Sequence, residues 1–394
     1  MTPPLLVIGA GAAGTAAAWC AVRAGIEVTL VHDLPGATEL YSGAVAGQPS
    51  APASPLDDEV RGFVRALGLW SVEPRGHRVA TGSGVVRAAC GIDHALLDLE
   101  PLAGLRIAVA DVEREHYDGK SLACALGASE WARQTRTRFD PVRVDLLRRE
   151  QERRFTHHDF AELHDSAERI EWLAERLGRA SLSHDAWLLG PWLGLEPAAI
   201  AQLRLALLRP VGETTSLPGG AAGDRFRHAR DQLLAESGVR VVRSRVLRQS
   251  FGEGVCRAEL EAAEVATLEA FAVVVAVGGL VSGGIELASP DALAEPFRLS
   301  LSVPVTLGVD AKELDTVSTL HGPVLDRLGP GVLDRVGILT EGPAARGARQ
   351  LFVAGGCLAD RPRTVLEAVE SGIQAARAAL RRSVRPPPPR EPEA

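Results

Sequence analysis

The chain has 394 residues, a formal net charge of −7 and a pI near 5.9. This length suits two domains or one large interleaved fold, and the acidic balance argues against nucleic-acid binding, which needs a basic face. The five cysteines include no C-x-x-C pair, so we expect no disulfide framework, no iron–sulfur cluster and no metal site within this chain.

The first 22 residues carry no charged side chain, a property shared by membrane anchors and signal peptides. Gly9, Gly11 and Gly14 interrupt this run and weaken a membrane helix. No basic segment precedes it, as a signal peptide would require. We therefore expect neither an anchor nor a signal, and a cytoplasmic protein.

The same stretch is typical of a nucleotide-binding turn. It divides into strand Leu5–Ile8, the G-x-G-x-x-G turn Gly9–Gly14, the alanine-rich helix Thr15–Ala24, its stop Gly25, and strand Ile26–Val31. In that arrangement the three glycines allow the tight turn, the approach of backbone to a pyrophosphate, and close packing of the helix on the sheet. The anion would then lie at the helix N-terminus.

Asp33 follows the second strand at the distance expected for an acid that binds the ribose hydroxyls. A solvated acid at a strand end is the alternative. Ala12 and Ala13, inside the turn, complete this first group of predicted cofactor contacts.

Further along the chain, the pattern alternates between helices and strands. After a loop over 36–58, the predicted helices are Asp58–Leu67, ended by Gly68, then Phe155–Leu177, with Thr156 as N-cap and Asp159 as its third residue, then Asp224–Ser237, ended by Gly238, and Thr364–Arg382. The predicted strands are Arg106–Val112, Val239–Val246, Val255–Leu260, Leu268–Val277 and Gln350–Ala354. A disordered proline-rich tail is predicted over 383–394.

Nucleotide-type features recur at three separated places: residues 5–33, the segment ending Val273–Gly279, and Leu351–Gly356 followed by a helix. A simple nicotinamide dehydrogenase keeps its cofactor domain in one block, whereas large flavoproteins assemble theirs from separate segments. We therefore predict an α/β protein of the glutathione-reductase-like Rossmann type. Its flavin-binding domain would comprise 1–75, 219–288 and 330–382, and an inserted α/β substrate or cap domain would comprise 76–218 and 289–329.

On these motifs the sequence resembles the glutathione-reductase-like flavoproteins and, within them, the B-subunit family of anaerobic glycerol-3-phosphate dehydrogenase. The stretches that carry the resemblance are Gly36–Ala44, Arg106–Val112, Phe155–Asp165, Gly212–Pro218, Val275–Gly284 and Leu351–Gly372. The resemblance implies oxidation of glycerol 3-phosphate to dihydroxyacetone phosphate, with electrons passing towards quinone. It also implies a catalytic FAD subunit and an iron–sulfur subunit as partners, and at most a peripheral membrane contact.

The cofactor implied by the resemblance is a flavin. FMN is usually assigned to this family, whereas the G-x-G-x-x-G turn suits the dinucleotide FAD. Ser42 and Gly43 fall where relatives pass the isoalloxazine, with a solvated loop as the alternative. Gly355 and Gly356 fall where backbone approaches the ribityl or phosphate groups, with a plain turn as the alternative and Cys357 at a position where many flavoproteins have Asp. The remaining implied cofactor contacts are Val246, Ala276, Gly278 and Gly372.

Fewer residues are predicted to contact the substrate than the cofactor. Arg87 matches a basic position of the family and is the candidate for binding a substrate phosphate, and Glu213 is a second candidate for a polar group in the pocket. The catalytic base is unknown. His157, His158 and His164 share a predicted helix with Asp159 and Asp165, but they lack the H-E-x-x-H spacing, so we interpret them as solvated helix positions.

Several positions depart from the family pattern. Val277 replaces the Thr of an Ala-Thr-Gly motif, Ala359 and Asp360 replace a glycine pair, and Gly219 and Gly220 follow Leu217-Pro218. These departures indicate a divergent member. Two alternatives therefore stay open: a flavin-free assembly subunit with a degenerate site, and another FAD-dependent oxidase or dehydrogenase.

Overall fold

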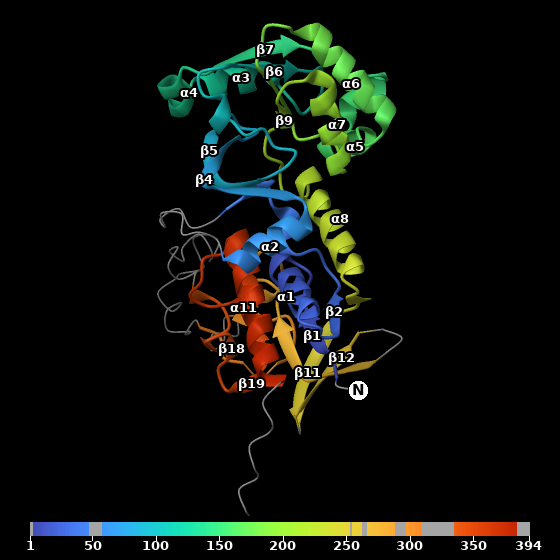
Figure 1. Cartoon of the computed structure of the whole chain (residues 1–394), viewed down its shortest axis with the longest axis vertical. Helices are drawn as coiled ribbons and strands as arrows, with labels where there is room; N and C mark the ends of the chain where they lie inside the picture. The colour runs from blue at the N-terminus through green and yellow to red at the C-terminus, as the bar shows by residue number, and fades with distance from the viewer. Residues whose placement is uncertain are drawn as a thin grey trace, which may run out of the picture. The chain divides into compact units, whose positions relative to one another are not determined.

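The structure, a computed structural model, describes residues 3–46, 57–252, 254–261, 266–287, 297–303, 305–308 and 335–383 (Figure 1). The chain forms two compact units. The first unit comprises Met1–Thr38, Asp58–Phe63 and Arg230–Ala394, and the second comprises Glu39–Asp57 and Val64–Ala229.

The first unit is built on a sheet with the strand order β10-β2-β1-β14-β19-β18-β17. Its parallel part contains β10 (Arg240–Arg243), β2 (Val28–His32), β1 (Leu5–Ile8), β14 (Ala272–Val275) and β19 (Ala348–Val353), and β18 (Ala344–Ala345) and β17 (Thr340–Glu341) extend it antiparallel. The sequences LLVI and AVVV of the two central strands are buried at every position. Such continuous apolar runs are typical of parallel strands covered on both faces.

Two helices and a second sheet provide that cover. Helices α1 (Ala12–Arg23) and α11 (Val365–Ser383) pack closely against each other, as the blue and red ribbons of Figure 1 show. On the other face, an antiparallel sheet of β11 (Val246–Gly252), β12 (Val255–Leu260) and β13 (Thr267–Ala270) shares one core with β1 and β14. The strand pair β15 (Ile285–Leu287) and β16 (Phe297–Leu299) adds to the same core.

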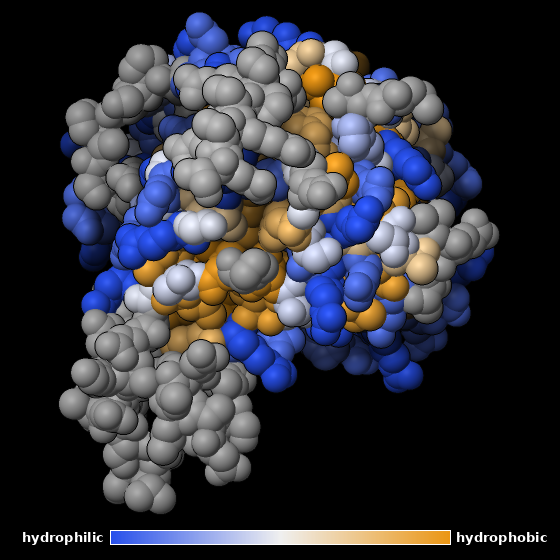
Figure 2. All heavy atoms as spheres, turned by 90° about the horizontal axis from the view of Figure 1, so that it is seen from below, coloured by the Kyte–Doolittle hydropathy of each residue, from blue (hydrophilic) through white to orange (hydrophobic). Residues whose placement is uncertain are grey.

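Apolar side chains also reach the surface. Partly buried residues such as Val242, Phe251 and Leu280 border the core of the first unit. Figure 2 shows hydrophobic residues gathered in the middle of the face it draws, with hydrophilic residues around them.

The second unit contains a smaller parallel sheet with the order β7-β6-β8-β9. Its strands are β6 (Arg106–Asp111), β7 (Arg138–Arg143), β8 (Ala186–Leu189) and β9 (Val211–Glu213). Side chains of α3 (Gly119–Gly127) and α4 (Glu130–Thr135) cover one face of this sheet. The other face is covered by α5 (His157–Leu163), α6 (Ala167–Ala180) and α7 (Pro197–Leu207).

An antiparallel sheet of β3 (Ala44–Val45), β5 (Val86–Asp93) and β4 (Trp70–Ala80) completes the second unit. Helix α2 (Asp58–Leu67) begins in the first unit and ends in the second, and α8 (Ala221–Glu236) begins in the second and ends in the first. Within the described ranges, no helix is both long enough and apolar enough to cross a bilayer.

The predicted α/β fold with a parallel sheet is confirmed. The unit boundaries differ from the predicted ones: the described residues 39–46, 57, 64–75 and 219–229, all predicted for the flavin-binding domain, group with the second unit. Of the predicted cap segment 289–329, the described residues 297–303 and 305–308 group with the first unit, and the others lie outside the described residues. The predicted tail lies outside them too from residue 384 onwards.

Three predicted elements are wrong in their continuity. The strand Val239–Val246 ends at Arg243 as β10, and Val246 already belongs to β11 of another sheet. The helix Phe155–Leu177 is two helices, α5 and α6, because Ser166 starts a new helix by accepting a hydrogen bond from the Arg169 amide at 3.3 Å. The strand Leu268–Val277 is likewise two strands, since β13 pairs antiparallel with β12 whereas β14 pairs parallel with β1.

Candidate functional site

The glycine turn after β1 has the geometry that its sequence predicts. Gly9 has a φ of 103°, and a Cβ there would lie 2.3 Å from the carbonyl oxygen of Ala276. A Cβ on Gly14 would lie 1.9 Å from the carbonyl oxygen of Gly9. Real side chains do not fit at these distances, so both positions need glycine for strand, turn and helix to pack as they do.

Gly11 is different, because the space beside it is open. It caps α1, and a Cβ built there would meet only the Thr38 hydroxyl, at 3.5 Å. The Thr38 hydroxyl accepts a hydrogen bond from the Ala12 amide at 3.1 Å. The first amides of a helix attract anions through their free N–H groups and the helix dipole. The residues at this turn therefore fit the pyrophosphate of a dinucleotide.

Two buried side chains form hydrogen bonds to the backbone of the turn. The carbonyl oxygen of Ala10 accepts hydrogen bonds from the Arg230 guanidinium and from the Thr15 hydroxyl, each at 3.3 Å. Arg230 is only 2% exposed. The backbone of the turn is thus fixed by partners far along the chain as well as by its own glycines.

The other predicted cofactor residues of the first unit lie mostly at the same edge of the parallel sheet. Ala276 and Gly278 follow β14, and Gly355 and Gly356 follow β19. The carboxyl edge of a parallel sheet is where ligands bind in open α/β folds. Ala13 packs against Gly372, whose Cβ would lie 2.1 Å from the Ala13 carbonyl oxygen.

Three further positions of the first unit differ from one another in their exposure to solvent. Asp33 is exposed after β2, and its carboxylate accepts a hydrogen bond from the Leu34 amide at 2.9 Å. Val246 is 3% exposed and lies in the core at the start of β11. Cys357 is fully buried, its thiol donates to the carbonyl oxygens of Ala354 and Val275 at 3.2 and 3.4 Å, and burial raises its pKa to about 11.

Ser42, Gly43 and Arg87 belong to the second unit. The Arg87 guanidinium donates to the Ser42 hydroxyl at 3.1 Å, so two residues predicted for different purposes lie side by side. Arg87 is exposed, and the Ser216 amide donates to the Ser42 carbonyl oxygen at 2.9 Å. The carbonyl oxygen of Gly43 accepts from the Asp93 amide at 2.7 Å.

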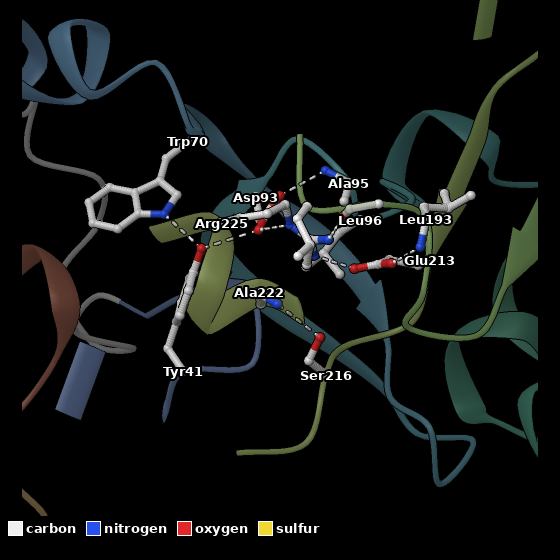
Figure 3. Close-up of polar contacts among 12 residues, drawn as sticks. Tyr41, Trp70, Asp93, Ala95, Leu96, Leu193, Glu213, Ser216, Ala222 and Arg225 are labelled. Carbon is white, nitrogen blue, oxygen red and sulfur yellow. Dashed lines mark hydrogen bonds and ion pairs between the residues drawn. The ribbon is translucent and has the colours of Figure 1, made fainter. Parts of the chain in front are cut away.

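Glu213 lies in a buried ion network that Figure 3 shows. Glu213 and Asp93 both pair with Arg225, and the side chains of all three have no exposed surface. The second oxygen of Glu213 accepts from the Leu193 amide at 2.9 Å. Both carboxylate oxygens are therefore engaged inside the protein, which gives Glu213 a structural part.

The network continues to an aromatic pair. The Arg225 Nε donates to Asp93 Oδ2 at 2.8 Å, and the Tyr41 hydroxyl donates to the same oxygen at 3.2 Å. Trp70 Nε1 donates to the Tyr41 hydroxyl at 3.1 Å. Burial, followed by the charge of Asp93, raises the pKa of Tyr41 well above its usual value. Arg225 and Asp93 were not predicted, because they are far apart in the sequence and match no local motif.

The histidines of the predicted helix are not all solvated, so that interpretation is wrong for His164. His164 is completely buried, and its Nδ1 lies 2.6 Å from the Trp192 carbonyl oxygen. His158 pairs with Asp224 at 2.8 Å, and Asp165 accepts from the Leu195 amide at 2.8 Å. Among the residues that the structure describes, no three His, Cys, Asp or Glu side chains come together as a metal site.

Acidification is expected to destabilise the second unit through His164. Burial lowers its pKa to about 3 from the ordinary 6.5, and burial also lowers that of His157 to about 4. Between these values the unfolded chain binds more protons than the folded one, so stability falls as the pH falls below 6.5, by about 1.4 kcal/mol per unit for each histidine. Urea unfolding at several pH values should show this slope. His164→Gln should reduce this slope, and an unchanged slope in that variant would contradict the assignment.

Comparison with known proteins gives a partial match. The family model for glucose inhibited division protein A matches residues 4–65, the segment that contains β1, α1, β2 and most of α2. No curated protein sequence matches the chain.

Solved structures resemble the chain at low identity. BexE is 11% identical with a TM-score of 0.35, and the match covers 97% of this chain and 63% of that one. A flavoprotein/dehydrogenase from Cytophaga hutchinsonii is 12% identical with a TM-score of 0.34, covering 96% and 78%. CtdE, solved in complex with FAD, is 10% identical with a TM-score of 0.34, covering 96% and 88%. The chain thus spans less than two thirds of BexE, and the fold assignment rests on the strand order described above.

Proposed function

We propose that the chain is an FAD-dependent oxidoreductase, with the FAD pyrophosphate at the turn between β1 and α1. The observation that carries the proposal is the meeting of three glycine turns, after β1, β14 and β19, at one carboxyl edge of the parallel sheet. A glycine turn after a single strand is common, whereas here the three turns also pack backbone against backbone, since a Cβ on Gly9 would lie 2.3 Å from the Ala276 carbonyl oxygen and one on Gly279 would lie 2.6 Å from the Gly356 carbonyl oxygen. This packing leaves Gly11 as the open position at which a pyrophosphate can approach the backbone. FAD, when bound, supplies a two-electron acceptor for substrate oxidation.

The residues have separate tasks in this proposal. The amides after Gly11 receive the pyrophosphate in place of the Thr38 hydroxyl. The exposed carboxylate of Asp33 accepts hydrogen bonds from the ribose hydroxyls. Buried Arg230 fixes the carbonyl of Ala10 and so keeps the turn in shape.

We further propose that the substrate is glycerol 3-phosphate or a related secondary alcohol, on the family resemblance described above. Arg87 is then the group that binds the phosphate, since a guanidinium suits phosphate oxygens. A catalytic FAD subunit and an iron–sulfur subunit would be its partners, with the membrane contacted only through them. Bleaching of the flavin absorbance by glycerol 3-phosphate in the presence of these subunits tests this narrower proposal.

A flavin-free assembly subunit is the second candidate. Thr38 already satisfies the Ala12 amide, and Val277 replaces the expected Thr. The absorbance spectrum of the purified protein, with mass spectrometry of the small molecule released on denaturation, separates the two. A yellow protein that releases FAD supports the oxidoreductase, and a colourless one that takes up neither added FAD nor added FMN overturns it.

Gly11→Ala is the variant that tests the turn most directly. The new methyl group meets only Thr38, at an ordinary contact distance of 3.5 Å, so we expect the free energy of unfolding to change by less than about 0.5 kcal/mol. The same methyl group would lie where the pyrophosphate approaches, so FAD affinity should fall about tenfold or more. Gly127→Ala, at a site where a Cβ meets nothing within 4 Å, is the control. Equal FAD affinity in both variants would place the cofactor elsewhere.

A further inference from the structure

A cavity of about 700 Å³ lies at the carboxyl edge of the parallel sheet of the second unit. The segments that follow β6 and β7 line it, and its residues include Asp111, Arg114, Tyr117, Lys120, Arg143 and Arg153. Helices cover both faces of this sheet, as they do in doubly wound folds that bind ligands outside the carboxyl ends of their strands. The volume is within the range of small-molecule sites, about 300 to 1,000 Å³.

Three residues of this lining have buried polar atoms without a hydrogen-bond partner among the described residues. These atoms are Asp111 Oδ2, Arg114 Nε and Nη1, and the Tyr117 hydroxyl. Asp111 and Arg114 are each only 7% exposed. A buried polar group left unpaired costs about 1 to 3 kcal/mol, and native proteins usually supply a partner. Their gathering around one cavity makes this edge of the sheet the candidate ligand site of the second unit.

The charges around the cavity show where an anion would bind. Arg143 and Arg153 share Glu113, and Arg154 pairs with Glu115. Arg114 has no such carboxylate among the described residues, and its guanidinium lies over the rings of Phe160 and Trp192, at 4.3 and 4.7 Å from their centroids. Its Nη2 donates to the carbonyl oxygens of Phe155 and Thr156 at 2.6 and 3.1 Å. Among the described residues it is therefore the cation of this lining without a direct ion pair, and Glu152 acts on it only from farther away.

The surroundings of Asp111 indicate a second feature of the ligand. Lys120 Nζ and Arg143 Nη1 lie 3.9 and 3.8 Å from Asp111 Oδ2, so the charge of the carboxylate is balanced although its hydrogen bond is missing. A neutral hydroxyl can donate that bond without adding a third positive charge, which an ammonium group would do. The ligand should then carry a hydroxyl as well as an anionic group.

We propose that this cavity binds a small hydroxylated anion, a sugar-sized phosphate ester or sugar acid, with its anionic group at Arg114 and Tyr117 and a hydroxyl at Asp111. The site lies wholly within the second unit, and it does not depend on the proposed flavin chemistry. Phosphate and carboxylate share the geometry that a guanidinium recognises, so the experiment has to separate these two sources.

Calorimetric titration of the full-length protein provides the test. The probes are ribose 5-phosphate, gluconate, ribose and inorganic phosphate, at about 150 mM salt so that exposed charges are screened. We expect one of the two hydroxylated anions to bind at least about tenfold more tightly than ribose and inorganic phosphate, because only it engages both ends of the site. Tighter binding of ribose 5-phosphate would identify the ligand as a phosphate ester, and tighter binding of gluconate would identify it as a sugar acid.

Two variants remove single polar atoms from the site. Tyr117→Phe deletes a hydroxyl that has no partner in the free protein, so stability should be kept while affinity falls about tenfold. Asp111→Asn keeps the shape of the side chain and should weaken binding of the hydroxylated anion but not of inorganic phosphate. Arg179→Gln removes an exposed charge that pairs with Glu175, outside the cavity lining, and is the matched control.

Three results would overturn the proposal: no binding of either hydroxylated anion, equal binding of all anions, or unchanged affinity in Tyr117→Phe and Asp111→Asn. An equal loss of affinity in Arg179→Gln would also overturn it, because it would indicate nonspecific ion binding only. The flavin content of each variant, measured in the same preparations, is expected to stay unchanged, so a failure here is distinguishable from a failure of the proposed function.

Discussion

Replacing Arg225 with methionine is expected to lower the free energy of unfolding by about 3 to 5 kcal/mol. The Arg225 side chain is fully buried and carries the only guanidinium that the described structure pairs with Asp93 and Glu213. Without it, two buried carboxylates lose the guanidinium that is paired with them, while Arg204 acts on both only from farther away. The Gly194 carbonyl also loses a donor at 2.6 Å. Burial already raises the pKa of Glu213 above its ordinary value, and the loss of Arg225 removes the group that opposes this shift.

The size of this deficit should depend on pH in a defined direction. A carboxyl group whose pKa is raised by folding stabilises the folded state when protonated, and that contribution is lost as the pH rises through the folded pKa. Urea unfolding of Arg225→Met at pH 7 and pH 5, relative to wild type at each pH, should therefore show a smaller deficit at pH 5.

Arg227→Met is the matched control for Arg225→Met, because Arg227 lies on the same helix, is 45% exposed and, within the described part of the chain, pairs with nearby Asp224 alone. Exposed pairs of this kind contribute little, so a change below about 0.5 kcal/mol is expected. If the two methionine variants unfold alike, the buried network does not stabilise the second unit.

Replacing Gly14 with alanine is expected both to destabilise the first unit and to remove the flavin. The added methyl carbon would lie 1.9 Å from the Gly9 carbonyl oxygen and 3.4 Å from the Ala276 side chain. Backbone has to move to make room, which costs about 1 to 3 kcal/mol, and the displaced turn no longer offers its amides to a pyrophosphate. Thermal unfolding and flavin absorbance of the purified variant measure the two effects.

Gly178→Ala is the control for this change, because Gly178 also lies within a helix and its added carbon would approach only the Leu207 side chain, at 3.8 Å. Alanine is the better helix former by about 0.5 to 1 kcal/mol, so this variant should be as stable as wild type or more so. A Gly14→Ala protein that is stable and yellow would show that the turn tolerates a side chain, and the proposed pyrophosphate site would be wrong.

Local signals in the sequence predicted the elements that depend on neighbouring residues. Helix α2 runs from Asp58 to Leu67 as its amphipathic pattern and Gly68 indicate. Thr156 and Asp159 form the reciprocal capping hydrogen bonds expected at the start of α5. Hydrogen bonds between residues three positions apart, and apolar spacing along one face, are both contained in a short window of sequence.

Features that join distant segments could not be predicted in the same way. Arg225 and Asp93 are 132 positions apart, and nothing near either residue indicates a buried partner. Of the parallel strands of the second unit, only β6 was predicted. The strands β8 (Ala186–Leu189) and β9 (Val211–Glu213) have too few residues to show a period. The parallel sheet of the second unit, and with it the cavity at its edge, follows from how these strands pair in space.

The strand order of the first unit has a consequence for the order of events during synthesis. β1 pairs with β14 at Leu5 and Ala272, and β14 pairs in turn with β19 at Val273 and Leu351. The emerging N-terminal strand therefore has to remain without its central neighbour on the ribosome until most of the chain has been translated. The parallel strands of the second unit fall within residues 106–213, so this unit can complete its core earlier in synthesis. At that stage β14 and β19, which pack beside the glycine turn in the folded protein, have not yet been translated.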